Sequence, residues 1–204
     1  MSDVSVFLLC ISAIFLIGII GELVFARTGI PDVVWLIVVG IVLGLSISRL
    51  LTGLARFIQH PLRDQVYPIH LAWVFFLLIS VIHFWWFEFQ LITLRVWTFE
   101  MYIFVISYAG LFFMTCTLLF PDRMDEYSGY REYLMSRRRW FFGLLAIIFL
   151  VDVVDAYLKG VEHLQSFGVE YPVRTVVFVG VCIAAMVTTN QRFHALFAIA
   201  ALIY

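Results

Sequence analysis

The feature that most constrains this sequence is a succession of long apolar segments, which polar residues interrupt only briefly. A helix needs about 20 apolar residues to cross roughly 30 Å of membrane hydrocarbon. Six segments reach or approach that length, and a seventh is shorter. They cover residues 4–25, 33–57, 69–89, 97–120, 140–158 and 172–189, with the short one at 193–204. The sequence therefore predicts an all-α fold, a polytopic transmembrane helical bundle that forms a single domain over residues 1–204.

Composition agrees with lipid as the solvent of this chain. Hydrophobic residues make up 64% and charged residues 13%, whereas soluble domains have about 45–50% and roughly 25%. The net charge of −1 gives no basic surface for nucleic acid. Segment 4–25 has no basic residues before it and no small-residue cleavage site after it, so we predict a retained span rather than a signal peptide.

The breaks between the segments carry residues that end or begin helices. Gly29 and Pro31 separate the first two segments, and so short a connection predicts an antiparallel hairpin of the helices at 4–25 and 33–57. Pro121 and Asp122 follow the fourth segment. The polar stretch 121–139 is the longest in the chain, and we expect all of it to lie in water.

Lys and Arg residues predict the orientation, because they are enriched on the cytoplasmic side of inner-membrane proteins. With seven crossings, eight of them fall on the side of the N-terminus: Arg56, Arg63, Arg123, Arg131, Arg137, Arg138, Arg139 and Arg192. Four fall on the other side: Arg27, Arg95, Lys159 and Arg174. We therefore expect a cytoplasmic N-terminus. The run of Arg137, Arg138 and Arg139 before Trp140 is typical of a topology anchor beside anionic lipid.

Two stretches resemble known proteins. The first comprises Gly21-Glu22-Leu23-Val24-Phe25, Arg27 to Val33, Gly40 and Gly44. Over residues 14–45 it resembles the first helices of monovalent cation:proton antiporters. Those antiporters have more helices and an ion site with adjacent acidic residues. This chain has no Asp-Asp or Asn-Asp pair, so the resemblance does not carry antiport activity to it.

The second stretch is most of the remaining chain. Its motifs are Arg49 to Arg56, His70-Leu71-Ala72-Trp73, His83-Phe84-Trp85-Trp86, Leu119-Phe120-Pro121-Asp122 and Arg139-Trp140-Phe141-Phe142-Gly143. From residue 45 onward the chain resembles small, uncharacterised bacterial integral membrane proteins. The resemblance implies a location in the bacterial inner membrane and supplies no activity.

Ionisable residues inside a span are costly and each suggests a function. Arg49 lies well inside the second segment, and Ser46, Arg49, Gly53 and Arg56 form one polar stripe at helical spacing. Asp152 and Asp155 share a face of the fifth segment. We predict that Arg49 faces the interior and pairs with Asp152 or Asp155. Such a pair either fixes the bundle or serves in an ion or proton relay.

Secondary polar candidates are Ser46, His70, His83 and Glu100. His70 and His83 could suggest a bundle haem, but their spacing places them about 140° apart around one helix. They cannot share a ligand, and we expect hydrogen-bonded histidines and no cofactor.

Motifs of soluble enzymes are missing: no GxSxG, HExxH, P-loop or Rossmann glycine pattern occurs. We therefore expect no enzyme. Cys10, Cys116 and Cys182 lie in apolar stretches without metal-site spacing, and we predict buried thiols with no disulfide and no metal. Gly40 and Gly44 form a GxxxG pattern, which allows close helix packing inside the bundle or, alternatively, in a homo-oligomer.

Two functions remain open. One is a small transporter or ion- or proton-conducting protein centred on Arg49, Asp152 and Asp155. The alternative is a non-catalytic membrane subunit or scaffold that binds a partner protein or lipid through its basic cytoplasmic loop.

Overall fold

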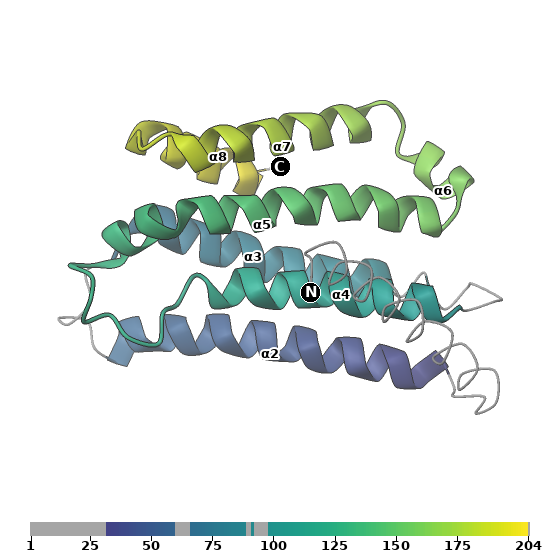
Figure 1. Cartoon of the computed structure of the whole chain (residues 1–204), viewed down its shortest axis with the longest axis horizontal. Helices are drawn as coiled ribbons and strands as arrows, with labels where there is room; N and C mark the ends of the chain where they lie inside the picture. The colour runs from purple at the N-terminus through teal and green to yellow at the C-terminus, as the bar shows by residue number, and fades with distance from the viewer. Residues whose placement is uncertain (1–31, 60–65, 89–90, 92–97, 204) are drawn as a thin grey trace, which may run out of the picture.

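The computed structural model describes residues 32–59, 66–88, 91 and 98–203. Within these ranges every regular element is helical, and the long helices run side by side along one axis (Figure 1). The helices are α2 (Asp32–Gln59), α3 (Pro68–Glu88), α4 (Phe99–Thr117), α5 (Tyr130–Leu158), α6 (Val161–Ser166), α7 (Glu170–Val187) and α8 (Gln191–Ile203). The predicted helical bundle is confirmed.

Five of these helices are long and apolar enough to cross a membrane: α2 over Ile37–Gln59, and α3, α4, α5 and α7 over their full lengths. Helix α8, with 13 residues, is shorter. The expectation of six full spans is therefore not met within the described residues. The predicted span at 4–25, and the hairpin it was expected to form, lie outside them. These helices make the chain an integral membrane protein.

The outward-facing side chains need lipid around them. In α7 only 22% of the apolar span is buried inside the bundle, and Val176, Val177, Ile183 and Val187 are all more than half exposed. Apolar surface of this extent is unfavourable in water and suits the hydrocarbon of a bilayer. Lipid contact around the bundle follows from this.

The core is built on aromatic rings that join three helices. Trp73 of α3 is fully buried, and its ring centroid lies 5.5 Å from that of Phe141 and 5.3 Å from that of Phe142, both in α5. The ring of Phe197 in α8 lies 5.0 Å away. Contacts of this kind position α3 and α5, the two helices that carry the acidic residues discussed below.

Small polar groups inside the spans are satisfied by their own helices. The hydroxyls of Ser80, Thr115 and Thr175 each donate a hydrogen bond to the carbonyl four residues earlier, as suits a medium without water. Cys116 and Cys182 are buried and free, as predicted. Cys10 lies outside the described residues.

The two ends of the bundle, at left and right in Figure 1, differ in the charged residues that they carry. At one end α2 and α7 end and α5 and α8 begin. We call it the basic end because its arginines are Arg56, Arg123, Arg131, Arg137, Arg138, Arg139 and Arg192. At the other end α3 and α5 end, and α6 and α7 begin. We call it the acidic end because its carboxylates are Glu88, Glu100, Asp152, Asp155, Glu162 and Glu170.

The helix that contains the predicted segment 140–158 begins earlier than that segment and includes the second half of the polar stretch 121–139. Helix α5 begins at Tyr130, and just before it the backbone N–H and hydroxyl of Ser128 both donate to the Glu132 carboxylate, at 2.9 and 2.6 Å. The side chains of Tyr133 and Leu134 are buried, on the face of α5 that continues as the buried face of the span. This helical periodicity lies among charged residues, which obscured it in the sequence. The short helix α6 was also not predicted.

The two GxxxG glycines have different surroundings. A Cβ atom on Gly40 would come within 3.1 Å of the Trp85 ring in α3, whereas one on Gly44 would meet no described atom within 4 Å. Gly40 thus serves packing inside the bundle. Nothing described supports the alternative of a homo-oligomer contact.

Gly53 is the tightest glycine in the described bundle, and it predicts a stability effect. A Cβ atom there would overlap the ring of Phe120, so Gly53→Ala should push that ring out of its packing and destabilise the protein by about 1–3 kcal/mol. Gly180→Ala in α7 is the matched control, because nothing described lies within 4 Å of its added methyl group. Thermal unfolding in detergent measures both. Equal melting temperatures for the two variants would refute the close contact.

Candidate functional site

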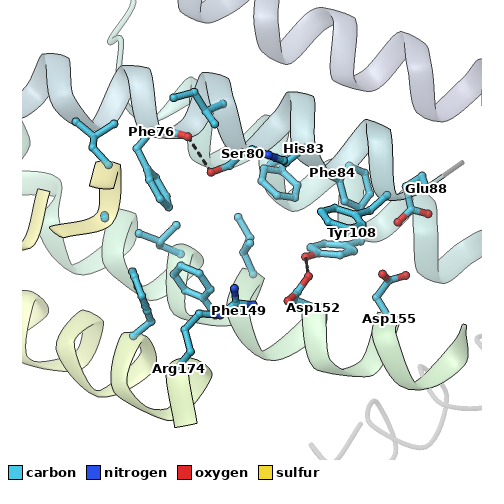
Figure 2. A pocket seen from close by; sticks show the side chains of 18 of the residues that line it. Phe76, Ser80, His83, Phe84, Glu88, Tyr108, Phe149, Asp152, Asp155 and Arg174 are labelled. Atoms are coloured by element: carbon cyan, nitrogen blue, oxygen red, sulfur yellow. Dashed lines mark hydrogen bonds between the residues drawn. The ribbon is translucent and has the colours of Figure 1, made fainter. Parts of the chain in front are cut away.

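Polar side chains from several elements gather at the acidic end. Figure 2 shows Glu88 of α3, Tyr108 of α4, and Asp152 and Asp155 of α5 lying close to one another, with Arg174 of α7 further along the same cavity. Helix periodicity explains the aspartates, because residues three apart share a helix face. Since α3 ends where α5 ends, Glu88 comes to the same level.

Lys159 is the centre of this cluster. It follows the last residue of α5 directly, and its Nζ lies 2.9 Å from Oε1 of Glu88 and 2.5 Å from Oδ2 of Asp155. All three side chains are buried: Lys159 is 4% exposed, Glu88 1% and Asp155 9%. The ammonium group therefore joins two helices through an ion triad that water hardly reaches.

The charge state of Lys159 follows from its neighbours. Burial by itself lowers the pKa of the ammonium group, and the carboxylates of Glu88 and Asp155 more than offset this, so that the pKa lies above its usual value. An opposite charge at hydrogen-bonding distance favours the charged form of a group. Lys159 is thus a fixed positive charge at neutral pH.

Asp152 is held by two phenols from other helices. Tyr171 of α7 donates to Oδ2 at 2.8 Å, and Tyr108 of α4 donates to Oδ1 at 3.3 Å. Both carboxylate oxygens of Asp152 therefore accept a hydrogen bond from a phenol. The guanidinium of Arg174 lies over the Tyr171 ring, 5.0 Å from its centroid.

One carboxylate oxygen in the cluster has no donor. Oε2 of Glu88 is buried and makes no hydrogen bond within the part of the chain that the structure describes. A buried polar atom in this condition is costly, and the cost falls if a proton or a ligand donor reaches it. The site thus has unused capacity to accept a proton or a donor group.

Two cavities flank the cluster. The larger has a volume of about 510 Å³ and lies between α3, α4, α5, α7 and α8. The smaller has a volume of about 270 Å³ and reaches Lys159, His163 and Glu170. Phe87, Asp152, Asp155 and Arg174 line both. The two aspartates therefore lie between two spaces that can hold water or a small solute.

The predicted pairing of Arg49 is wrong. Its guanidinium bonds to the carboxylate of Asp122, in the loop between α4 and α5 at the basic end, whereas Asp152 and Asp155 lie at the acidic end. Other residues of the polar stripe of α2 contact the same loop as Arg49. Arg56 donates to the carbonyl of Pro121 at 3.5 Å, and Gly53 faces Phe120. The loop turns back over α2, and Arg49 reaches its partner there.

The secondary candidates do not form one site. Ser46 is buried and donates to the carbonyl of Val42 in its own helix. The Nε2 atom of His70 lies 2.7 Å from the carbonyl oxygen of Leu119 at the basic end. His83 is exposed and lines the larger cavity, and Glu100 is exposed in the first turn of α4. His70 and His83 therefore lie apart, as their spacing predicted.

The three consecutive arginines lie on the early turns of α5. Arg137 donates to the hydroxyl of Tyr127 at 3.0 Å, Arg138 donates to the carbonyl of Met135 at 2.7 Å, and Arg139 is exposed. Their place at the basic end agrees with the predicted anchor, whose lipid contact stays a prediction.

Sequence reasoning missed Glu88 and Lys159 as site residues. Glu88 lies at the end of a predicted span and was not selected, and Lys159 was counted only for orientation. A usable signal was present, because Asp155 and Lys159 are spaced four apart and so face each other on a helix. Among the described residues no group of three or more His, Cys, Asp or Glu side chains is arranged to hold a metal ion.

Comparisons of the chain with models of protein families, with curated proteins and with solved structures find no match. The function of the chain is therefore inferred from the chemistry of the site itself.

The ion triad predicts a double-mutant cycle. Lys159→Met leaves the buried carboxylates of Glu88 and Asp155 without their cation, and removing one member of a buried pair costs about 3–5 kcal/mol. Adding Glu88→Gln to Lys159→Met removes one of the stranded charges, so the double variant should unfold at a higher temperature than Lys159→Met alone. Thermal unfolding in detergent measures the cycle. Strictly additive effects would show that the triad does not act as a unit.

The Arg49–Asp122 pair predicts a pH dependence. The hydrogen bond from Arg49, with the charge of its guanidinium, lowers the pKa of Asp122. A carboxyl group with a lowered folded-state pKa stabilises the fold above its unfolded pKa, and this effect is lost as pH falls through the folded pKa. The melting temperatures of wild type and Asp122→Asn should therefore differ at neutral pH and converge well below pH 3.8, the usual pKa of the group. Asp125→Asn, an exposed neighbour in the same loop, is the control. A difference that persists at acid pH would contradict the pair.

Proposed function

We propose that this protein is a small membrane transporter in which the carboxyl groups of Asp152, Asp155 and Glu88 take up and release protons beside the fixed positive charge of Lys159. The observation that carries the proposal is the position of the two aspartates on the walls of both cavities. A carboxylate between two hydrated spaces can receive a proton from one and pass it to the other. Ionisable groups within spans commonly mark such relays.

Charge balance supports this role. Around the larger cavity, which Glu170 does not line, Glu88, Asp152 and Asp155 supply three negative charges, and Arg174 and the Lys159 bonded to two of these carboxylates supply two positive ones. One negative charge is left in a site where uncompensated charge is costly. Binding one proton or one monovalent cation removes the imbalance, so the cluster is suited to exchange one positive charge.

The geometry of the triad suggests how such an exchange moves through the site. Lys159 divides its hydrogen bonds between Glu88 and Asp155. When Glu88 takes up a proton, its attraction for the ammonium group falls, and Lys159 shifts toward Asp155. Loss of the proton restores the shared arrangement. The titratable and charged side chains facing this exchange from the packed elements are His83, Glu88, Tyr108, Asp152, Asp155, Lys159, His163, Glu170, Tyr171 and Arg174.

A second candidate function is a non-catalytic membrane subunit or scaffold. The exposed side chains of Arg131, Arg137 and Arg139 on the early turns of α5 support it, because a basic helical surface beside the membrane attracts anionic lipid or an acidic partner. A scaffold function would give the acidic end no role. Transport measurements therefore distinguish the transporter from the scaffold. For either function we propose that the protein lies in a bacterial inner membrane with its N-terminus in the cytoplasm.

Flux through reconstituted vesicles tests the transporter. The purified protein is placed in vesicles of phosphatidylethanolamine and phosphatidylglycerol that contain a pH-sensitive dye, and a potassium diffusion potential or a gradient of monovalent cation is imposed. We expect the internal pH to change, and Asp152→Asn to slow the change at least about tenfold. Asp152→Asn keeps an oxygen acceptor for one tyrosine, which favours a folded variant.

Asp125→Asn is the matched control, because it removes one carboxylate from an exposed loop at the basic end. Melting temperatures confirm that each variant is folded before flux is compared. No pH change under any imposed gradient, or wild-type flux in Asp152→Asn, would contradict the proposal, and the first result would favour the scaffold.

A further inference from the structure

We infer that the larger cavity binds an organic cation, a protonated amine with an apolar aromatic or aliphatic body. This inference rests on the proposed transport function and names the class of solute that the site would carry. It draws on the size of the cavity, the composition of its two ends and the unpartnered oxygen of Glu88.

The cavity has the size and walls of a small-molecule site. Its volume of about 510 Å³ falls within the roughly 300–1,000 Å³ that is common for such sites. Aromatic side chains from four helices contribute to its apolar wall, among them Phe76, Phe84, Phe112, Phe149 and Phe178. Rings of this kind accept an apolar body, and their faces attract a cation.

The carboxylates occupy one end of this cavity. In Figure 2 Glu88, Asp152 and Asp155 lie together at one side, and Phe76 and Phe149 lie toward the other. A ligand with a charged head and an apolar tail would therefore adopt one orientation, with its head at the carboxylates and its tail among the phenylalanines.

Charge decides the sign of the head group. Three carboxylates line the cavity against one cation on its wall, Arg174. The ammonium group of Lys159 is bonded to Glu88 and Asp155, so it does not offer a free partner to an anion. Arg174 in turn lies over the ring of Tyr171. An anionic ligand would meet net repulsion here, and a cationic ligand would neutralise the excess negative charge.

Glu88 provides an observation independent of the charge count. Its side chain is 1% exposed and lines the cavity, and its Oε2 atom accepts no hydrogen bond from any described residue. The N–H group of a protonated amine is the kind of donor that this oxygen lacks. An inorganic cation would use the carboxylates and leave the aromatic wall without a role.

Three ligands of matched shape test the inference: 4-phenylbutylammonium, the neutral 4-phenylbutanol and the anionic 4-phenylbutyrate. Each is titrated calorimetrically into the full-length protein in lipid nanodiscs, with empty nanodiscs as the blank for partition into lipid. We expect the ammonium compound to bind at least about tenfold more tightly than the other two. Equal or tighter binding of the butyrate would overturn the inference, and this comparison needs no variant to fold.

Two variants then locate the site. Asp152→Asn should weaken binding of the ammonium compound at least about tenfold, and Phe149→Leu should weaken both the ammonium compound and the alcohol because it removes a ring from the wall. Asp125→Asn should leave binding unchanged. Unchanged binding in a folded Asp152→Asn would overturn the inference.

The failures of the two proposals are distinguishable. Binding of the ammonium compound without any pH change in vesicles would leave the cation site in place and remove the transport function. A pH change that depends on Asp152, without binding of the ammonium compound, would leave the transport function in place and remove the organic cation.

Discussion

The contact of Lys159 with Glu88 and Asp155 determines how the acidic end of this bundle is organised. It joins the last turn of α3 to the last turn of α5, and these helices are held together further along by the ring of Trp73 against Phe141 and Phe142. Inside a membrane a charge cannot be solvated by nearby bulk water. The positive charge of Lys159 and the negative charges of Glu88 and Asp155 therefore compensate one another in part. Both cavities lie beside the ends of α3 and α5 that the triad joins.

The fold could be predicted from the sequence because lipid imposes a simple rule on it. Apolar runs of the right length identified α2, α3, α4 and α7 to within a few residues, since no water is available to an interrupted helix in hydrocarbon. The start of α5 was missed because Tyr130, Tyr133 and Leu134 bury one face while charged residues cover the others. Hydropathy averages over the faces of a helix, so it does not detect this one-sided pattern.

The site could be predicted only in part, because pairing depends on how helices are placed relative to one another. Asp152 and Asp155 were identified from their depth in a span. The partner of Arg49 was not, since the loop after α4 turns back over α2 and brings Asp122 within reach. Depth along a helix says how costly a charge is, but it does not say which neighbouring segment compensates it. Lys159 was missed for a related reason: it follows the end of its helix and yet is buried by α3.

The composition of the acidic end is itself an argument for a function there. Buried ion pairs contribute little net stability, and apolar side chains of similar volume often serve the fold equally well or better. A triad that leaves one negative charge and one oxygen without a donor among the described residues is less favourable still than a balanced pair. The same features are needed in a site that binds and releases a positive charge, because a fully compensated site would have no affinity for one. Asp152 and Asp155 also line two cavities, so there is space beside these carboxylates for the water or solute that the proposed exchange requires.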